Sequence, residues 1–238
     1  MHFFFSREIS NGIIALNEEE TDHCNRVLRL KTGDVVGVLD GKGNLYHCTI
    51  AEQSKKNNKL AIRAIVSSDP GHFNVHIALA PTKHMDRNEW FVEKATELGI
   101  QEISFLECKR SERKKISTER LVKIAVSALK QSRNRYLPVI NPIREYDSFL
   151  NSAYFDAQIY IAYIGEPVNT SLPACIKADR QYILLIGPEG DFTDEEVALA
   201  VSKGFAPVSL GPQRFRTETA ALVGLQTFIL FNQLRKDS

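Results

Sequence analysis

Two short stretches of the chain place glycine, proline and charged residues directly after apolar runs. Residues 182–191 read Tyr-Ile-Leu-Leu-Ile-Gly-Pro-Glu-Gly-Asp, and Thr193 and Glu196 follow with the spacing of a helix capping box. This pattern predicts a buried strand, a loop and a helix N-terminus, the junction at which open α/β sheets bind ligands. An ordinary strand-to-helix turn uses the same residues, so the stretch alone leaves both interpretations open.

Residues 208–221 repeat this arrangement and read Val-Ser-Leu-Gly-Pro-Gln-Arg-Phe-Arg-Thr-Glu-Thr-Ala-Ala. They predict a short strand, a second Gly-Pro loop and another helix start. Arg216, Thr217, Glu218 and Thr219 fall in that loop or in the first helical turn. Two such junctions can bring their loops together at one sheet edge, where unpaired backbone N–H groups bind polar ligand atoms.

The common nucleotide, metalloprotease and serine hydrolase motifs are absent from the sequence. All six histidines lie within the first 84 residues, outside the expected ligand crevice, so we expect each to be structural, or groove-lining for His23. The four cysteines lie far apart without a CxxC pair. We therefore expect reduced thiols in the cytoplasm and no metal site.

Residues 1–68 predict a small β-barrel domain. Strands are expected at 35–39 and 45–50, joined through Asp40-Gly41 as a hairpin, and at 59–66. A short helix is expected within 18–30. Residues 67–71, Ser-Ser-Asp-Pro-Gly, then predict a linker.

After the linker, strands and helices alternate. Strands are expected at 75–80, 103–106, 158–162, 182–186 and 207–210, and helices at 87–98, 118–134, 194–203 and 217–234. This alternation favours an α/β domain with a mostly parallel sheet covered on both faces. We expect two domains, 1–68 and 72–238.

Composition and charge narrow the class of protein. Of the 238 residues, 43% are hydrophobic and 25% charged, which is typical of a soluble globular protein. No apolar run reaches the length of a membrane span, so no membrane association is expected. Residues 109–135 contain ten basic and two acidic residues, whereas residues 145–200 contain ten acidic and two basic residues. The basic block favours an anionic partner, although a solvated helix face would also carry such charge.

Taken together, the motifs resemble the RsmE family of the SPOUT class of RNA methyltransferases. The resemblance covers nearly the whole chain. Besides the two Gly-Pro stretches, it is carried by His23, 27–30, Gly33-Asp34, Asp40-Gly41, Lys83, Asp86-Arg87, Glu89-Trp90, 94–99, Ser111-Glu112-Arg113 and Gln131-Ser132. The chain departs from the family pattern at Lys130 and Arg133, which flank the Gln-Ser pair, and at Gln213, where the family commonly has arginine.

The resemblance implies a fold, a cofactor and a reaction. The fold would be an N-terminal PUA-like β-barrel and a C-terminal SPOUT parallel-sheet domain with a trefoil knot. The reaction would be S-adenosyl-L-methionine-dependent methylation of N3 of uridine 1498 in 16S rRNA of the small ribosomal subunit. The implied cofactor-binding residues are Ala162, Tyr163, Glu166, Ile186, Gly187, Pro188, Glu189, Gly190, Leu210, Gly211, Thr217 and Ala220.

Methylation of N3 requires loss of its proton, which spreads negative charge onto the uracil oxygens. We hypothesise that Arg216 stabilises this charge, as an oxyanion site does, and that Glu218 or Thr219 orients it or assists proton removal. Alternatively, Arg216 and Glu218 pair with each other or cap the final helix. Glu189 could contact the cofactor or a partner subunit. Alternatively, the helix dipole alone could favour a carboxylate at this position near a helix N-terminus.

The expected partners are 16S rRNA and a second copy of the chain. Candidate RNA contacts are Arg26, Arg29, Lys109, Arg110, Arg113, Arg133 and Arg135, although some could be plain surface charge. Residues 220–231 are apolar nearly all round, which favours burial against a partner subunit as well as the sheet, and the family is homodimeric. Two alternatives stay open: a SPOUT methyltransferase with another RNA target, and a non-catalytic RNA-binding protein.

Overall fold

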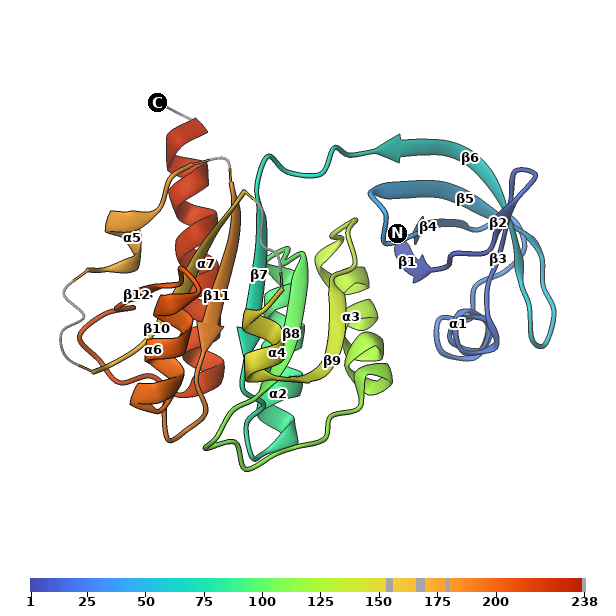
Figure 1. The fold of residues 1–238 in the computed structure, drawn as a ribbon. Coiled ribbons are helices and arrows are strands. Elements are labelled where there is room, and N and C mark those ends of the chain that lie inside the picture. The colour runs from blue at the N-terminus through green and yellow to red at the C-terminus, as the bar shows by residue number, and fades with distance from the viewer. Residues whose placement is uncertain (153–155, 166–169, 179, 237–238) are drawn as a thin grey trace. The chain divides into compact units, whose positions relative to one another are not determined.

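A computed structural model describes residues 1–152, 156–165, 170–178 and 180–236 (Figure 1). Contacts between residues divide the chain into two compact units. The first unit contains residues 1–70 and 126–137, and the second contains 71–125 and 138–238. The sequence did not predict that residues 126–137 group with the first unit.

The first unit is built on a six-stranded sheet of order β1-β4-β5-β6-β3-β2, in which only β1 and β4 pair in parallel. Its elements are β1 (His2–Phe5), β2 (Ile9–Ser10), β3 (Ile13–Ala15), α1 (Glu18–Asp22), the π-helix η1 (His23–Val27), β4 (Val35–Leu39), β5 (Asn44–Glu52) and β6 (Lys59–Ser67). The expected helix within 18–30 is thus two short pieces.

This sheet curls around a single core. Phe4, Ile14, Val38, Cys48 and Leu60, which come from five different strands, belong to one buried cluster. The Ser6 hydroxyl, just after edge strand β1, donates to the Ala15 carbonyl of β3 at 2.7 Å. Three strands stand between β1 and β3 in the sheet order, so this contact requires the sheet to bend around its core, which agrees with the small barrel expected from the sequence.

The predicted hairpin at Asp40-Gly41 is present between β4 and β5. The Asp40 carboxylate accepts hydrogen bonds from the backbone N–H groups of Lys42 and Asn44, and from the Asn44 amide. Gly41 has φ +72°, a conformation that glycine adopts without strain.

The second unit contains a fully parallel sheet of order β12-β10-β11-β7-β8-β9. Its strands are β7 (Asn74–Leu79), β8 (Glu102–Glu107), β9 (Val139–Glu145), β10 (Ala157–Ala162), β11 (Gln181–Ile186) and β12 (Ala206–Val208). The helices are α2 (Met85–Glu97), α3 (Thr118–Ser132), α4 (Tyr146–Leu150), α5 (Leu172–Cys175), α6 (Asp194–Ser202) and α7 (Thr217–Lys236). Residues 126–132 of α3 belong to the first unit by their contacts.

Central strand β11 shows why the sheet is covered on both faces. Ile183 and Leu185 join a buried cluster that includes Phe149 of α4 and Ala200 of α6. Tyr182 points to the opposite face and stacks on Phe228 of α7, with ring centroids 4.6 Å apart. Successive strand residues alternate between faces, so a strand buried on both sides reads as a continuous apolar run. The parallel sheet predicted from strand–helix alternation is confirmed.

Candidate functional site

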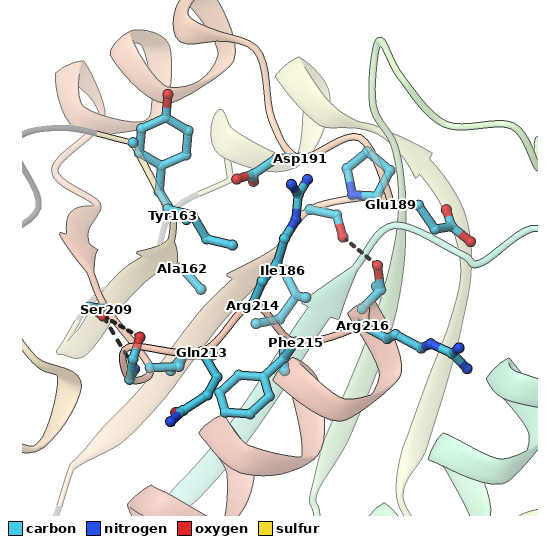
Figure 2. Close-up of a pocket in the computed structure, with 18 of the residues that line it drawn as sticks. Ala162, Tyr163, Ile186, Glu189, Asp191, Ser209, Gln213, Arg214, Phe215 and Arg216 are labelled. Carbon is cyan, nitrogen blue, oxygen red and sulfur yellow. Dashed lines mark hydrogen bonds between the residues drawn. The ribbon is translucent and has the colours of Figure 1, made fainter.

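Three neighbouring strands end at one edge of the parallel sheet. Ala162, the last residue of β10, pairs with Ile186 at the end of β11 and with Val208 at the end of β12. The loops that follow these strands therefore lie side by side, as expected for the two Gly-Pro stretches. They enclose a cavity of about 520 Å³ at the carboxyl ends of the strands (Figure 2).

The cavity brings together most of the residues predicted to bind the cofactor. Those that line it are Ala162, Tyr163, Ile186, Gly187, Pro188, Glu189, Leu210, Gly211, Thr217 and Ala220. Gly190 does not line the cavity, and its carbonyl accepts a hydrogen bond from Arg110 at 2.7 Å. Glu166 lies outside the described residues.

A hydrogen bond joins the two Gly-Pro loops. The Thr217 hydroxyl, at the start of α7, donates to the Gly187 carbonyl at 3.0 Å, and Thr217 is only 5% exposed. Gly187 also packs closely: a Cβ added there would lie 3.0 Å from the backbone nitrogen of Phe192. The N-terminus of α6 is fixed by the predicted capping box between Thr193 and Glu196.

Glu189 connects the first Gly-Pro loop to the loop between β7 and α2. Its carboxylate accepts a hydrogen bond from the backbone N–H of Lys83 at 3.0 Å. Arg113 fixes the same segment by donating to the carbonyls of Thr82 and Lys83 at 3.1 and 2.6 Å. Glu189 thus lines the cavity and also holds the Lys83 backbone. Its contact with a ligand stays a prediction.

Of the three predicted catalytic residues, only Arg216 lines the cavity. Glu218 is buried, and one of its carboxylate oxygens lies 3.7 Å from Nε of Arg87 in α2, while the other accepts no hydrogen bond from any residue that the structure describes. Within the described part of the chain, no ion pair or hydrogen bond joins Arg216 to Glu218. The structure therefore supplies no contact by which Glu218 or Thr219 would orient Arg216, and their catalytic roles stay predictions.

Asp191 is a cavity residue that the sequence did not single out. It has φ +61°, and its carboxylate accepts a hydrogen bond from the Phe192 N–H at 2.8 Å. Burial raises the pKa of Asp191, while hydrogen bonds from backbone N–H groups and the nearby Arg214 oppose that rise. In Figure 2, Arg214 extends toward Asp191. The only signal in the sequence was its position after the Gly-Pro-Glu-Gly loop.

The cations predicted to contact RNA divide between the two units. In the first unit, the Arg26 side chain is 78% exposed, Arg29 and Arg133 are exposed with φ near +60°, and Arg135 donates to the Val66 carbonyl. In the second, Lys109 pairs with Glu195, while Arg110 and Arg113 bind backbone carbonyls beside the cavity. Contacts within the protein are thus not confined to the last three, because Arg26 also pairs with Asp22 and Arg133 lies over the Phe3 ring. RNA binding by any of the seven stays a prediction.

The described residues contain neither a metal-binding cluster nor a helix that could span a membrane. No group of three or more His, Cys, Asp or Glu side chains in them could hold a metal ion. None of the helices there is long and apolar enough to cross a membrane.

Comparisons with known proteins agree with this architecture. The family described as RNA methyltransferase domain matches residues 69–229, and the RNA methyltransferase PUA domain matches residues 16–62. A ribosomal RNA small subunit methyltransferase E from Aquifex aeolicus is 29% identical over 231 residues, which are 93% of this chain and 96% of that protein.

Solved structures cover almost the whole chain. A probable rRNA-methyltransferase from Porphyromonas gingivalis has a TM-score of 0.91 and 36% identity, covering 99% of this chain and 100% of that one. A ribosomal RNA small subunit methyltransferase E from Neisseria gonorrhoeae, bound to S-adenosyl methionine, has a TM-score of 0.85 and 25% identity, covering 97% of each chain. With its PUA domain and its matched catalytic domain, the chain belongs to the RNA methyltransferase family, among the relatives of ribosomal RNA small subunit methyltransferase E.

Proposed function

We propose that the chain methylates N3 of uridine 1498 in 16S rRNA of the small ribosomal subunit, using S-adenosyl-L-methionine bound in the cavity beside the two Gly-Pro loops. The observation that carries the proposal is this cavity, which lies at the carboxyl ends of β10, β11 and β12 inside the matched methyltransferase domain. Small ribosomal subunit methyltransferase E relatives, one of them bound to this cofactor, support the choice of substrate and cofactor.

The residues around the cavity fit such a cofactor. Its volume of about 520 Å³ lies in the range of small-molecule sites, which is about 300–1,000 Å³. S-adenosylmethionine carries both positive and negative groups, and the lining offers carboxylates at Glu189 and Asp191 and guanidinium groups at Arg214 and Arg216. When bound, the cofactor would supply a methyl group on a positively charged sulfur. Gly187 and Gly211 allow backbone groups to approach it closely.

Residues of this chain would then stabilise the negative charge that forms on the uracil. Arg216 is exposed and lines the cavity, so its guanidinium can donate hydrogen bonds to a uracil oxygen as the N3 proton leaves. The pair of buried Glu218 and half-buried Arg87 would hold the start of α7, and thereby the backbone that carries Arg216. Glu218 would act as a positioning residue in this scheme.

We also propose that two copies of the chain associate through α7. Leu230 and Leu234 of this helix are 47% and 69% exposed, and Trp90 of neighbouring α2 is 42% exposed. Exposed apolar side chains on two helices that contact each other favour burial by a partner. The knotted chain path is likewise carried over from the resemblance, as is the cytoplasmic location.

Calorimetric titration with S-adenosylmethionine tests the proposal and separates it from a non-catalytic RNA-binding protein. The wild-type chain should bind the cofactor saturably. Gly187→Ala should weaken binding, because the added methyl group crowds the Phe192 backbone, whereas Gly71→Ala adds the same group without crowding and should not. Absence of binding to the folded wild-type chain would contradict the proposal.

A further inference from the structure

A second polar site lies at the opposite edge of the parallel sheet. His76, Glu102 and Asn141 stand near the amino ends of β7, β8 and β9, and the strand register pairs His76 with Glu102. With Ser104 of β8, these side chains line a cavity of about 740 Å³. The carboxyl-end cavity proposed for methyl transfer shares no lining residue with it.

The four side chains form a polar ring, three sides of which are hydrogen-bond contacts, while the fourth is a longer contact between His76 and Glu102. The Asn141 amide nitrogen donates to a Glu102 carboxylate oxygen at 2.7 Å and contacts the Ser104 hydroxyl at 2.9 Å. Nε2 of His76 lies 2.8 Å from that hydroxyl, and its Nδ1 lies 3.7 Å from the other Glu102 oxygen. Each side chain thus limits the orientation of the next, as in preorganised sites.

An irregularity of the sheet aims Asn141 into this ring. Ile103 pairs with Ile140, but Phe105 pairs with Ile143, so Ser104 faces two residues of β9. One of the two is Pro142, which a sheet accepts at an edge strand or a bulge. Bulges redirect side chains and occur often beside functional sites.

The ring also interrupts an otherwise apolar face. Ala78 and Leu106 of the same sheet face belong to a buried apolar cluster with Phe149 of α4, whereas Ser104 is 4% exposed and bears a hydroxyl. Burying polar groups is unfavourable unless they are hydrogen-bonded, and an apolar replacement is often at least as stable. Departures from the local pattern of this kind are expected at functional sites.

The Glu102 carboxylate is partly exposed and can pair with a charged ligand. Burial lowers the pKa of His76, so the imidazole is mostly neutral at pH 7 and does not neutralise the carboxylate. The Glu102 side chain is 41% exposed, and among the described residues no hydrogen bond reaches the oxygen that faces His76. Arg144 also lines the cavity, but its guanidinium binds Ser148 and Ser152.

We propose that this second cavity binds a small organic cation, an amidine or a primary amine, through the Glu102 carboxylate. A cation of this kind donates several hydrogen bonds to one carboxylate, and such charge-assisted bonds are the strong ones. Phe149, whose ring meets His76 edge-on at 5.6 Å, adds an aromatic side chain to the lining. The cavity is large enough to admit a ligand with one ring and part of a larger molecule.

Calorimetric titration with benzamidine tests the proposal, with neutral benzamide and anionic benzoate as probes of the same shape. Wild-type protein should bind benzamidine saturably and the other two at least about tenfold more weakly. Glu102→Gln keeps the shape and the acceptor for Asn141 but removes the charge, so it should weaken benzamidine binding about tenfold or more. Glu145→Gln, an exposed carboxylate of β9 outside the lining, is the matched control.

Equal binding of benzoate and benzamidine to the wild-type protein would overturn the proposal, as would no saturable binding. A loss in Glu145→Gln as large as in Glu102→Gln would also overturn it, because the effect would then be general surface charge. The comparison of three probes on the wild-type protein does not depend on the folding of any variant.

Discussion

Replacement of Thr217 by valine tests whether the two Gly-Pro loops are held together as the structure shows. Valine keeps the shape of the buried side chain but removes the hydroxyl that donates to the Gly187 carbonyl at 3.0 Å. Loss of one hydrogen bond, with a buried carbonyl left unpaired, lowers the free energy of unfolding by about 1–3 kcal/mol. A loss of about 2 kcal/mol would lower Tm by roughly 4–8 °C in a chain of this size.

The assay is urea unfolding together with calorimetric titration of S-adenosylmethionine. Thr227→Val is the matched control, because the Thr227 hydroxyl donates to a carbonyl four residues earlier in its own helix and joins no loops. Thr217→Val should lose more stability than the control and should also bind the cofactor more weakly. Equal stability and equal affinity in the two variants would refute the role given to this hydrogen bond.

Three further predictions concern charge. Arg216→Ala should lower kcat by about 10²–10³-fold and leave the midpoint of urea unfolding unchanged. Glu218→Gln should lower that midpoint. A wild-type kcat for Arg216→Ala would exclude Arg216 from the reaction. Arg29→Gly should keep or raise the free energy of unfolding, because Arg29 has φ +55°, which glycine adopts without strain. The same variant should bind RNA more weakly, and the slope of log K for RNA binding against log salt concentration should become shallower by about one. Unchanged RNA affinity at low salt would contradict this. The pKa of His76 is lowered by burial, so the unfolded chain binds the proton more readily, and urea unfolding should show stability falling as pH drops below about 6.5. His76→Gln should lose that part of the pH dependence, and an unaltered profile would contradict the assignment.

Local patterns in the sequence predicted the elements that position the site. The capping box at Thr193 and Glu196 and the Gly-Pro loops each depend on residues close in sequence, so their structure followed from spacing. Strand β9 was missed because Pro142 interrupts its pattern, and β2 has only two residues. The π-helix after α1 carries no spacing that separates it from an ordinary helix.

The partners of the site residues could not be predicted in the same way. Glu218 pairs with Arg87 and Glu189 with the Lys83 backbone, and each contact joins segments more than a hundred residues apart. Which charges meet across a folded sheet depends on strand order, which spacing within one segment does not encode. The predicted RNA contacts Arg110 and Arg113 likewise bind carbonyls of the protein that no local pattern could identify.

The most direct test of the proposed function is methylation of small ribosomal subunits that lack the modification, with isotopically labelled S-adenosylmethionine and with naked 16S rRNA in parallel. After digestion, mass spectrometry of the nucleosides should find the label in 3-methyluridine, and Arg216→Ala should nearly abolish it. Label in a different nucleoside, or RNA binding without any incorporated label, would contradict the account.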